Sequence, residues 1–162
     1  MSVLVLAEID NGALSPATAR IVAAASQLGP VDVLVTEAGI AAEAAATIAG
    51  VSRVRITNVA PLADALASSL VGLAGDYDFI VSSASTVGKD VLPRVAAKLD
   101  IQPVTDIVAV EAPNRFVRPI YAGNALETVT DNQSKHVLSF RASAFRPAAG
   151  GNSASIEAVG QD

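Results

Sequence analysis

The 162-residue sequence contains no cysteine, no tryptophan and a single histidine. Without cysteine the chain can form neither disulfides nor thiolate-ligated zinc or iron–sulfur sites, and it has no thiol nucleophile. It also lacks any apolar run near the ~18 residues that a membrane-spanning helix requires, so we expect no membrane insertion. The first residues enter a strand directly, without a basic signal region or an Arg-rich transit helix. These features favour a bacterial-type cytoplasmic location.

Aromatic residues are also scarce, at 4% of the chain, and basic residues do not form a stripe. The formal net charge is −5, and eight of the eleven Lys and Arg residues lie in the second half of the chain. A nucleic-acid-binding surface usually needs clustered basic residues with interleaved aromatics, so no nucleic-acid partner is expected. The basic residues of the second half are instead candidates for a protein interface.

The sequence is rich in apolar residues, at 51%, with 17% charged residues, which suits one domain with a sizeable core. Short apolar runs alternate with amphipathic stretches, and this alternation predicts a parallel sheet with helices on both faces. Parallel strands are predicted at residues 3–7, 31–35, 53–57 and 79–83, with helices near residues 16–28, 41–49, 61–74 and 88–99. The fold class is therefore a three-layer α/β/α, Rossmann-like domain of the nucleotide-binding type.

The pattern changes after Asp100, where short strands follow one another without helical stretches between them. We expect residues 104–141 to form mainly antiparallel strands that extend the parallel sheet. Residues 148–162 have the composition of a linker, so the domain is predicted to span residues 1–147. This tail is expected to be poorly ordered or extended, with few contacts to the core.

Three groups of residues were considered as sites of chemistry. Residues 83–90 (SASTVGKD) echo a P-loop, but Ser83 and Asp90 replace required residues, so a capped helix entry is the stronger interpretation. Glu8 and Asp10 form an acid pair, most simply a solvated strand end. His136 opens a core-type strand, which favours a structural role over catalysis. No catalytic constellation is found, so an enzyme is not expected.

Four segments together resemble the α subunit of electron transfer flavoprotein, in the same order along the chain. They are residues 3–8 (VLVLAE), 88–96 (GKDVLPRVA), 116–125 (FVRPIYAGNA) and 141–145 (RASAF). The resemblance covers the amino-terminal domain of that subunit and implies that a second, FAD-binding domain is missing beyond the tail.

The resemblance further implies a role in a heterodimeric electron carrier. The carrier passes electrons from acyl-CoA or other dehydrogenases, as in fatty acid β-oxidation, to a quinone reductase. In the family this domain packs against the β subunit, while FAD is bound mainly by the other domain of the α subunit. The chain alone is therefore expected to bind no FAD and to act as a scaffold and subunit-interaction domain.

Arg118, Tyr121 and Asn124 are the candidate subunit-interface residues, because they lie together in the most family-specific segment. Arg, Tyr and Asn offer directed hydrogen bonds, and Arg and Tyr are frequent interface anchors. A local interpretation is equally open. Arg118 would then pair with a nearby acid, and Asn124 would follow Gly123 because the turn needs residues that tolerate a left-handed backbone.

Two other functions were weighed. A stand-alone nucleotide-binding module of the universal-stress type needs a Gly-rich G-x-x-G…G-[ST] loop, which the sequence lacks. An enzyme of the ATP-pyrophosphatase type needs an S-G-G-x-D-S-like loop after the first strand, which residues 8–12 do not supply. Tight, saturable binding of ATP or AMP would favour one of these two alternatives.

Overall fold

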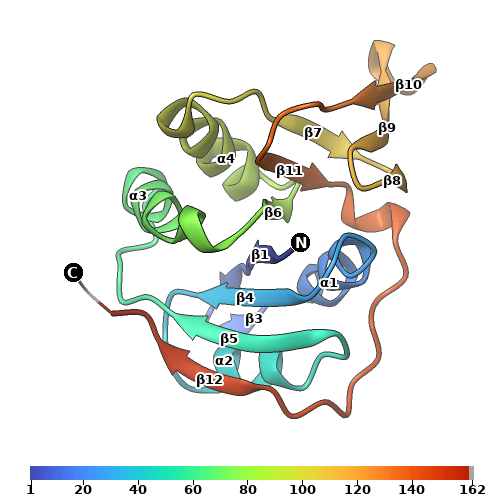
Figure 1. Cartoon of the computed structure of the whole chain (residues 1–162). Helices are drawn as coiled ribbons and strands as arrows, with labels where there is room; N and C mark the ends of the chain where they lie inside the picture. The colour runs from blue at the N-terminus through green and yellow to red at the C-terminus, as the bar shows by residue number, and fades with distance from the viewer. Residues whose placement is uncertain (161–162) are drawn as a thin grey trace.

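The computed structural model describes residues 1–160 and is built around a seven-stranded sheet (Figure 1). Every strand pair in this sheet is parallel, and the order across it is β12-β5-β4-β1-β6-β11-β7. The strands are β1 (Val3–Leu6), β4 (Val31–Val35), β5 (Val51–Ile56), β6 (Phe79–Ser83), β7 (Val104–Ile107), β11 (His136–Phe140) and β12 (Ser155–Ala158). The predicted α/β fold class is confirmed, and the four strands predicted as parallel neighbours are adjacent.

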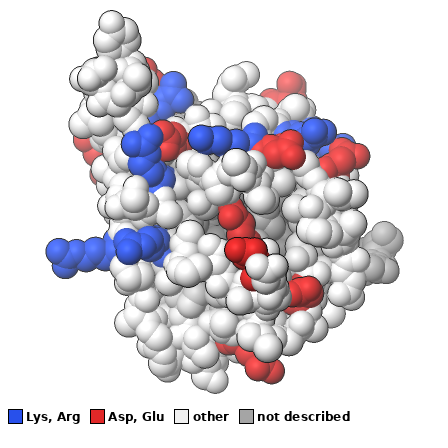
Figure 2. Space-filling model, turned by 180° about the vertical axis from the view of Figure 1, so that it is seen from behind, with Lys and Arg blue, Asp and Glu red and all other residues white. Residues whose placement is uncertain are grey.

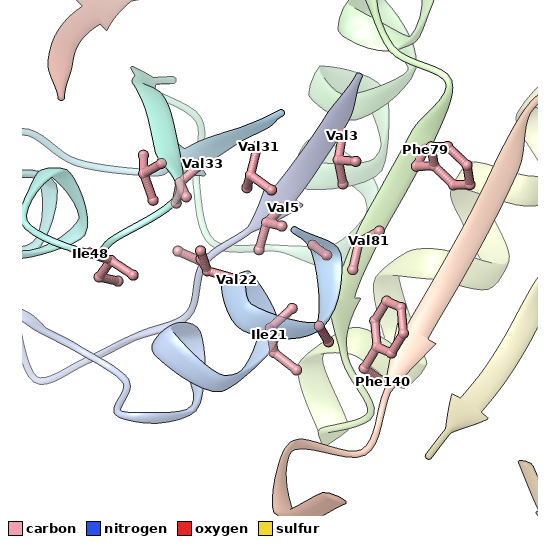
Figure 3. Packing of buried hydrophobic residues seen from close by; sticks show 14 of the residues in the cluster. Val3, Val5, Ile21, Val22, Val31, Val33, Ile48, Phe79, Val81 and Phe140 are labelled. Carbon is pink, nitrogen blue, oxygen red and sulfur yellow. The ribbon is translucent and has the colours of Figure 1, made fainter. Parts of the chain in front are cut away.

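Four helices cover the two faces of the sheet, as the sequence predicted. They are α1 (Ala17–Ala25), α2 (Ile40–Ala46), α3 (Ala63–Leu73) and α4 (Thr86–Leu99). Because strand side chains alternate between faces, β1 sends Val3 and Val5 toward α1 and α2 and sends Leu4 and Leu6 toward α3 and α4. Figure 3 shows the first of these two layers, where the valines of β1 and β4 pack with Ile21 and Val22 of α1. We call the sheet with these four helices the body.

The two strands at the far end of the sheet correct one prediction. β11 lies between β6 and β7 and is parallel to both. Residues 104–141 were expected to be mainly antiparallel strands, which holds for β8–β10 but not for β7 and β11. The expectation rested on the absence of helical stretches between the predicted strands of this segment. Here an antiparallel sheet, rather than a helix, fills the connection between β7 and β11. Burial of all five β11 residues is typical of a strand covered on both faces.

That antiparallel sheet is the second region of the molecule, and we call it the arm. It consists of β8 (Ala109–Ala112), β9 (Arg115–Ile120) and β10 (Ala125–Thr130), and the 3₁₀ turn η2 (Tyr121–Gly123) joins β9 to β10 at the tip. The strand order β10-β9-β8 is separate from the body's sheet, which confirms that extra antiparallel strands are present. Phe116 of β9 is fully buried in the α1-side core, so it anchors the arm to the body.

The tail contradicts its prediction of few contacts. After the 3₁₀ turn η3 (Ala142–Ala144), the extended chain crosses to the opposite edge of the sheet, where β12 pairs with β5 (Figure 1). Ala148 donates to the carbonyl of Ala19, and the Asn152 side chain donates to the carbonyls of Ile48 and Val51. The prediction of few contacts rested on the small apolar surface that this segment can bury. An open sheet edge supplies backbone partners that a segment of small polar residues can use. Residues 161–162 of the predicted tail lie outside the described residues.

Candidate interaction site

The arm projects beyond the body and carries all three residues singled out from the sequence. β9 and β10 are in regular antiparallel register, with Ile120 opposite Ala125 and Arg118 opposite Glu127. In Figure 1 the β9–β10 hairpin rises at the upper right, and in the reversed view of Figure 2 it is a projection whose outer end is white, without Lys, Arg, Asp or Glu. The arm thus presents an uncharged tip to solvent.

The tip exposes apolar side chains at three positions. Tyr121 is 82% exposed, Leu126 is 69% exposed and Ile120 is 36% exposed. Large apolar groups gathered at the end of a projecting hairpin mark an interaction site more readily than singly scattered ones do. The sequence analysis singled out Tyr121 but missed Ile120 and Leu126. The signal was available, because Ile120 directly precedes the turn and Leu126 follows it by three residues.

The backbone of the turn fixes the direction of Tyr121. Tyr121, Ala122 and Gly123 adopt positive φ angles of 52°, 51° and 85° in succession. Left-handed backbone costs free energy for residues other than glycine, so this turn orients the tyrosine at the expense of some strain. The observed conformation therefore favours a functional reason for Tyr121 at the tip over an arbitrary surface choice.

Arg118 lies in the middle of β9, and its side chain contacts neighbouring strands rather than the tip. Its Nε donates to Oε1 of Glu127 at 3.1 Å, across the two strands, and its Nη1 is 3.5 Å from the hydroxyl of Thr105 on β7. Its side chain is only about one-third exposed. These contacts match the local interpretation, in which Arg118 pairs with a nearby acid and links the arm to the body.

Asn124 closes the turn through its backbone. Its N–H donates to the carbonyl of Tyr121 at 3.0 Å, and its φ and ψ are −80° and −13°. This is right-handed backbone, so the suggestion that Asn124 was needed for a left-handed position is wrong. Tyr121 and Ala122 occupy left-handed positions instead. Asn124 thus lies near Tyr121 at the tip, whereas Arg118 does not join them.

The carboxyl edge of the central strands is the place where an α/β sheet usually binds ligands, and here it is closed. Glu8 follows β1 and accepts a hydrogen bond from the hydroxyl of Ser85, the N-cap residue of α4. The Ser85 Oγ in turn accepts from the N–H of Gly88 at 3.1 Å. The remaining cavity at this edge, bordered by Glu8 and Ser83, has a volume of only about 10 Å³. A carboxylate of the chain itself thus occupies the anion-binding end of α4.

These contacts also decide two interpretations from the sequence. Gly88 and Lys89 belong to the first turns of α4 rather than to a phosphate loop, so the capped helix entry is confirmed. Glu8 is not a solvated strand end, because its carboxylate is tied to Ser85, while Asp10 lies exposed in the short β2–β3 ribbon (Ile9–Asp10 and Ala13–Leu14). The sequence could not show that the loops after β1 and β6 meet.

His136 has the structural role that was favoured. The residue is buried at the start of β11, and its ring stacks on Phe79 at a centroid distance of 4.8 Å. Its Nδ1 lies 2.6 Å from Oδ2 of Asp131, the residue after β10. Burial alone would raise the pKa of Asp131, but hydrogen bonds from His136 and Gln133 outweigh it and lower that pKa. The pair joins the end of the arm to the body.

A larger groove lies on the α3 side of the sheet, and we call it the α3 groove. Its volume is about 650 Å³. Its walls come from β5, α3 and the residues after β12: Arg55, Thr57, Val59, Ser68, Ser69, Gly72, Leu73, Asp76, Val159 and Gly160. Among the described residues, the lining contains no aromatic side chain to stack on an isoalloxazine ring and no Gly-rich turn to hold a pyrophosphate. Neither this groove nor the closed edge fits FAD.

Within residues 1–160, no group of three or more His, Asp and Glu side chains is arranged to hold a metal ion. Among the helices of that part of the chain, none combines the length and the apolar character needed to cross a bilayer.

The chain is thus a Rossmann-like α/β domain whose usual ligand edge is filled by its own side chains and whose arm ends in an exposed apolar tip. Comparison with known proteins then identifies the family. The model of the electron transfer flavoprotein domain matches residues 3–162, and the chain belongs to this family.

The curated relatives agree on the subunit. The chain is 45% identical over 163 residues to the electron transfer flavoprotein subunit alpha of Paracoccus denitrificans, covering 96% of this chain and 53% of that protein. It is 42% identical to the subunit alpha of Pseudomonas aeruginosa, covering 98% of this chain and 54% of that protein. The subunit alpha of Bradyrhizobium diazoefficiens is 45% identical, with 98% and 53% covered. The chain spans about half the length of these relatives.

Proposed function

We propose that this chain is the scaffold and subunit-interaction domain of an electron transfer flavoprotein α subunit. In that complex electrons pass from dehydrogenases to a quinone reductase through FAD, and the chain has no catalytic residues of its own. The observation that carries the proposal is the projecting arm with Tyr121, Ile120 and Leu126 exposed at its tip. The family and its subunit name supply the partner, the β subunit of the same carrier.

The proposal leaves the flavin to other parts of the complex. The edge between β1 and β6 is filled by Glu8 and Ser85, and the α3 groove lacks aromatic side chains. Both features oppose a flavin site in the described residues. They also oppose the nucleotide-binding alternatives, since the carboxylate of Glu8 stands where a phosphate would bind to α4.

Within the arm, we propose that Tyr121 makes the main contact and that Asn124 holds the turn in place. Tyrosine is over-represented among the few interface residues that carry most of the binding free energy. Arg118 contributes less, because Glu127 and Thr105 already engage its guanidinium group. Replacing Arg118 would therefore change the geometry of the arm as well as any direct contact with the β subunit.

Calorimetry with the purified β subunit tests the proposal. We expect Tyr121→Ala to weaken association by about 2 kcal/mol and Arg118→Ala by no more than about 1–2 kcal/mol. Leu62→Ala is the matched control, because Leu62 is also a large exposed apolar residue but lies outside the arm. Equal affinities for the wild-type chain and the Tyr121 variant would contradict the proposed contact. A flavin absorbance band that stays with the isolated chain through gel filtration would contradict the cofactor assignment.

A further inference from the structure

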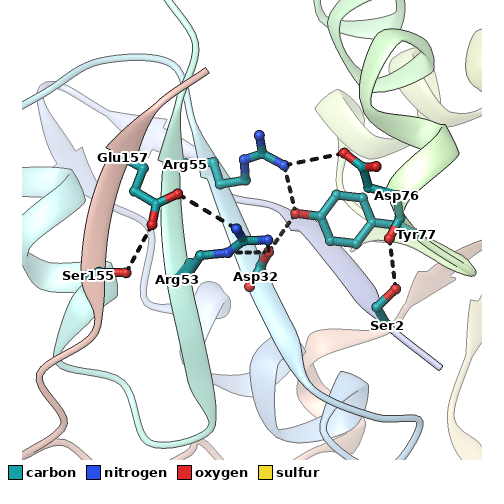
Figure 4. Close-up of polar contacts among 8 residues, drawn as sticks. All are labelled: Ser2, Asp32, Arg53, Arg55, Asp76, Tyr77, Ser155 and Glu157. Carbon is teal, nitrogen blue, oxygen red and sulfur yellow. Dashed lines mark hydrogen bonds and ion pairs between the residues drawn. The ribbon is translucent and has the colours of Figure 1, made fainter. Parts of the chain in front are cut away.

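One part of the central sheet lacks the helix cover that parallel sheets normally have. On the α3 side, β12, β5 and the Asp32 end of β4 present polar side chains (Figure 4), whereas Leu34 of β4 still belongs to the packed apolar layer. The register places Asp32 beside Arg53, and Arg53 beside Ser155. The polar side chains drawn there are Ser2, Asp32, Arg53, Arg55, Asp76, Tyr77, Ser155 and Glu157. The α3 groove opens beside this face.

The acidic side chains on this face lie closer to Arg53 than to Arg55. Arg53 donates to Oδ2 of Asp32 from Nε at 3.0 Å and from Nη2 at 2.7 Å, and Glu157 lies 3.6 Å from its Nη1. The Tyr77 hydroxyl donates to the same Asp32 oxygen at 2.5 Å. Burial and the bond to Asp32 raise the pKa of Tyr77, so the hydroxyl keeps its proton. Asp32 is therefore fully engaged by Arg53 and Tyr77.

Arg55 is left without a comparable partner. Its side chain is only 15% exposed, and its Nη1 donates to the neutral Tyr77 hydroxyl at 3.1 Å. Within residues 1–160 the carboxylate of Asp76 is the one ion-pair partner, and it stands 3.9 Å away and is 73% exposed. The Nε atom is buried and has no hydrogen-bond partner among the described residues. A largely buried guanidinium group with so little compensation is costly, and an anion on it would remove that cost.

The walls of the α3 groove match a small amphipathic anion. Arg55 supplies the positive charge, and the hydroxyls of Thr57 and Ser69 lie beside it, 3.0 Å from one another. Val59, Leu73 and Val159 supply apolar surface. The volume of about 650 Å³ lies within the usual range for small-molecule sites, about 300–1,000 Å³.

We propose that the α3 groove binds a short-chain aliphatic carboxylate. The carboxylate group sits on the guanidinium of Arg55, and the hydrocarbon chain runs along Leu73 and the two valines. A single arginine suits a monoanion. The negative charge of Asp76 near the same arginine disfavours a phosphate dianion. The apolar side chains of the groove offer such a dianion no hydrogen bonds.

Titration of the 162-residue chain with hexanoate, followed by calorimetry or by amide shifts in NMR spectra, tests this inference. We expect saturable binding with a dissociation constant on the order of 1 mM, because a ligand with so few atoms can gain only a small binding free energy. Acetate should bind more weakly, and inorganic phosphate should not compete. Arg55→Met should reduce hexanoate affinity at least tenfold. Arg94→Met, which removes the same charge from the exposed face of α4, should leave the affinity unchanged.

A second pair of variants avoids disturbing the polar cluster. Gly72 lines the groove in α3, and a Cβ atom there would meet nothing within 4 Å. Gly72→Leu should therefore fold normally, fill the groove and abolish hexanoate binding. Gly75→Leu is the control, because Gly75 has equal space but does not line the groove. Three outcomes would overturn the inference: no saturable binding, binding that survives both Arg55→Met and Gly72→Leu, or phosphate binding that matches that of hexanoate.

Discussion

The body and the arm use β-structure in opposite ways. In the body, β1, β4 and β11 are buried at every residue, so each strand has apolar contacts on both faces. In the arm, no residue of β10 is buried, and β9 buries Phe116 alone. Apolar packing therefore determines the body. The arm depends instead on cross-strand pairing, on one fully buried side chain and on a strained turn. A region held by so few contacts can present side chains to a partner without disturbing the core.

The largest expected effect comes from removing Phe116, the fully buried side chain that packs the arm against the body. Phe116→Ala removes a fully buried ring from the α1-side core, and we expect a loss of about 3–5 kcal/mol in the free energy of unfolding. Urea denaturation followed by circular dichroism measures it. The matched control is Tyr121→Ala, which truncates an exposed aromatic in the same arm and should change stability by no more than about 0.5 kcal/mol. Equal stabilities of the two variants would show that the arm is not anchored as described.

The body can be disturbed at its closest packing without touching the arm. A Cβ atom on Gly88 would lie 1.9 Å from the Ser83 carbonyl oxygen and 2.5 Å from the Ser82 hydroxyl, so α4 would have to move away from β6. We expect Gly88→Ala to lower the free energy of unfolding by about 1–3 kcal/mol, as overpacking does. Hydrogen exchange should report weaker protection in α4 and unchanged protection in the β9–β10 pairing. An unchanged unfolding midpoint would contradict this close contact, because it would mean that α4 and β6 leave room for a methyl group at Gly88.

The same contrast explains what the sequence could predict. Apolar runs and amphipathic periods identify the strands and helices of the body, because burial leaves a pattern in every residue. The direction of β11 was not predictable in this way, since a buried run has the same composition in either orientation. The course of residues 147–158 was missed for a related reason. Its backbone bonds to β5 and to the loops around α2 depend on an open sheet edge and leave no mark in the side chains.

The candidate site was predictable only in part. The segment around Tyr121 stood out by resemblance and by residue type, but periodicity says nothing about a hairpin tip or about the three consecutive left-handed residues there. The exposed apolar neighbours of Tyr121 and the internal partner of Arg118 follow from strand register. Register is fixed by the turn, and the turn is the least predictable part of the arm. The lack of a strong partner for Arg55 could not be predicted either, because it depends on how β4, β5 and Tyr77 lie relative to one another in the folded chain.

The smallest expected effect concerns the joint between arm and body, where Asp131 meets His136. Because the hydrogen bonds that Asp131 accepts in the folded chain lower its pKa below the ordinary value of 3.8, its ionised form favours folding. This contribution is complete above pH ~5 and is lost as the pH falls through 3.8 toward the lower folded pKa. Asp131→Asn should therefore be less stable than the wild-type chain at pH 6, and the difference should shrink on acidification toward pH ~3. Thermal unfolding at a series of pH values measures this, with Asp90→Asn on the exposed face of α4 as the control. A stability difference that stays constant with pH would show that Asp131 acts through packing rather than through its charge. Asp131 and His136 would then be held by packing, as the residues of the body are, and the region that depends on other contacts would extend no further than β10.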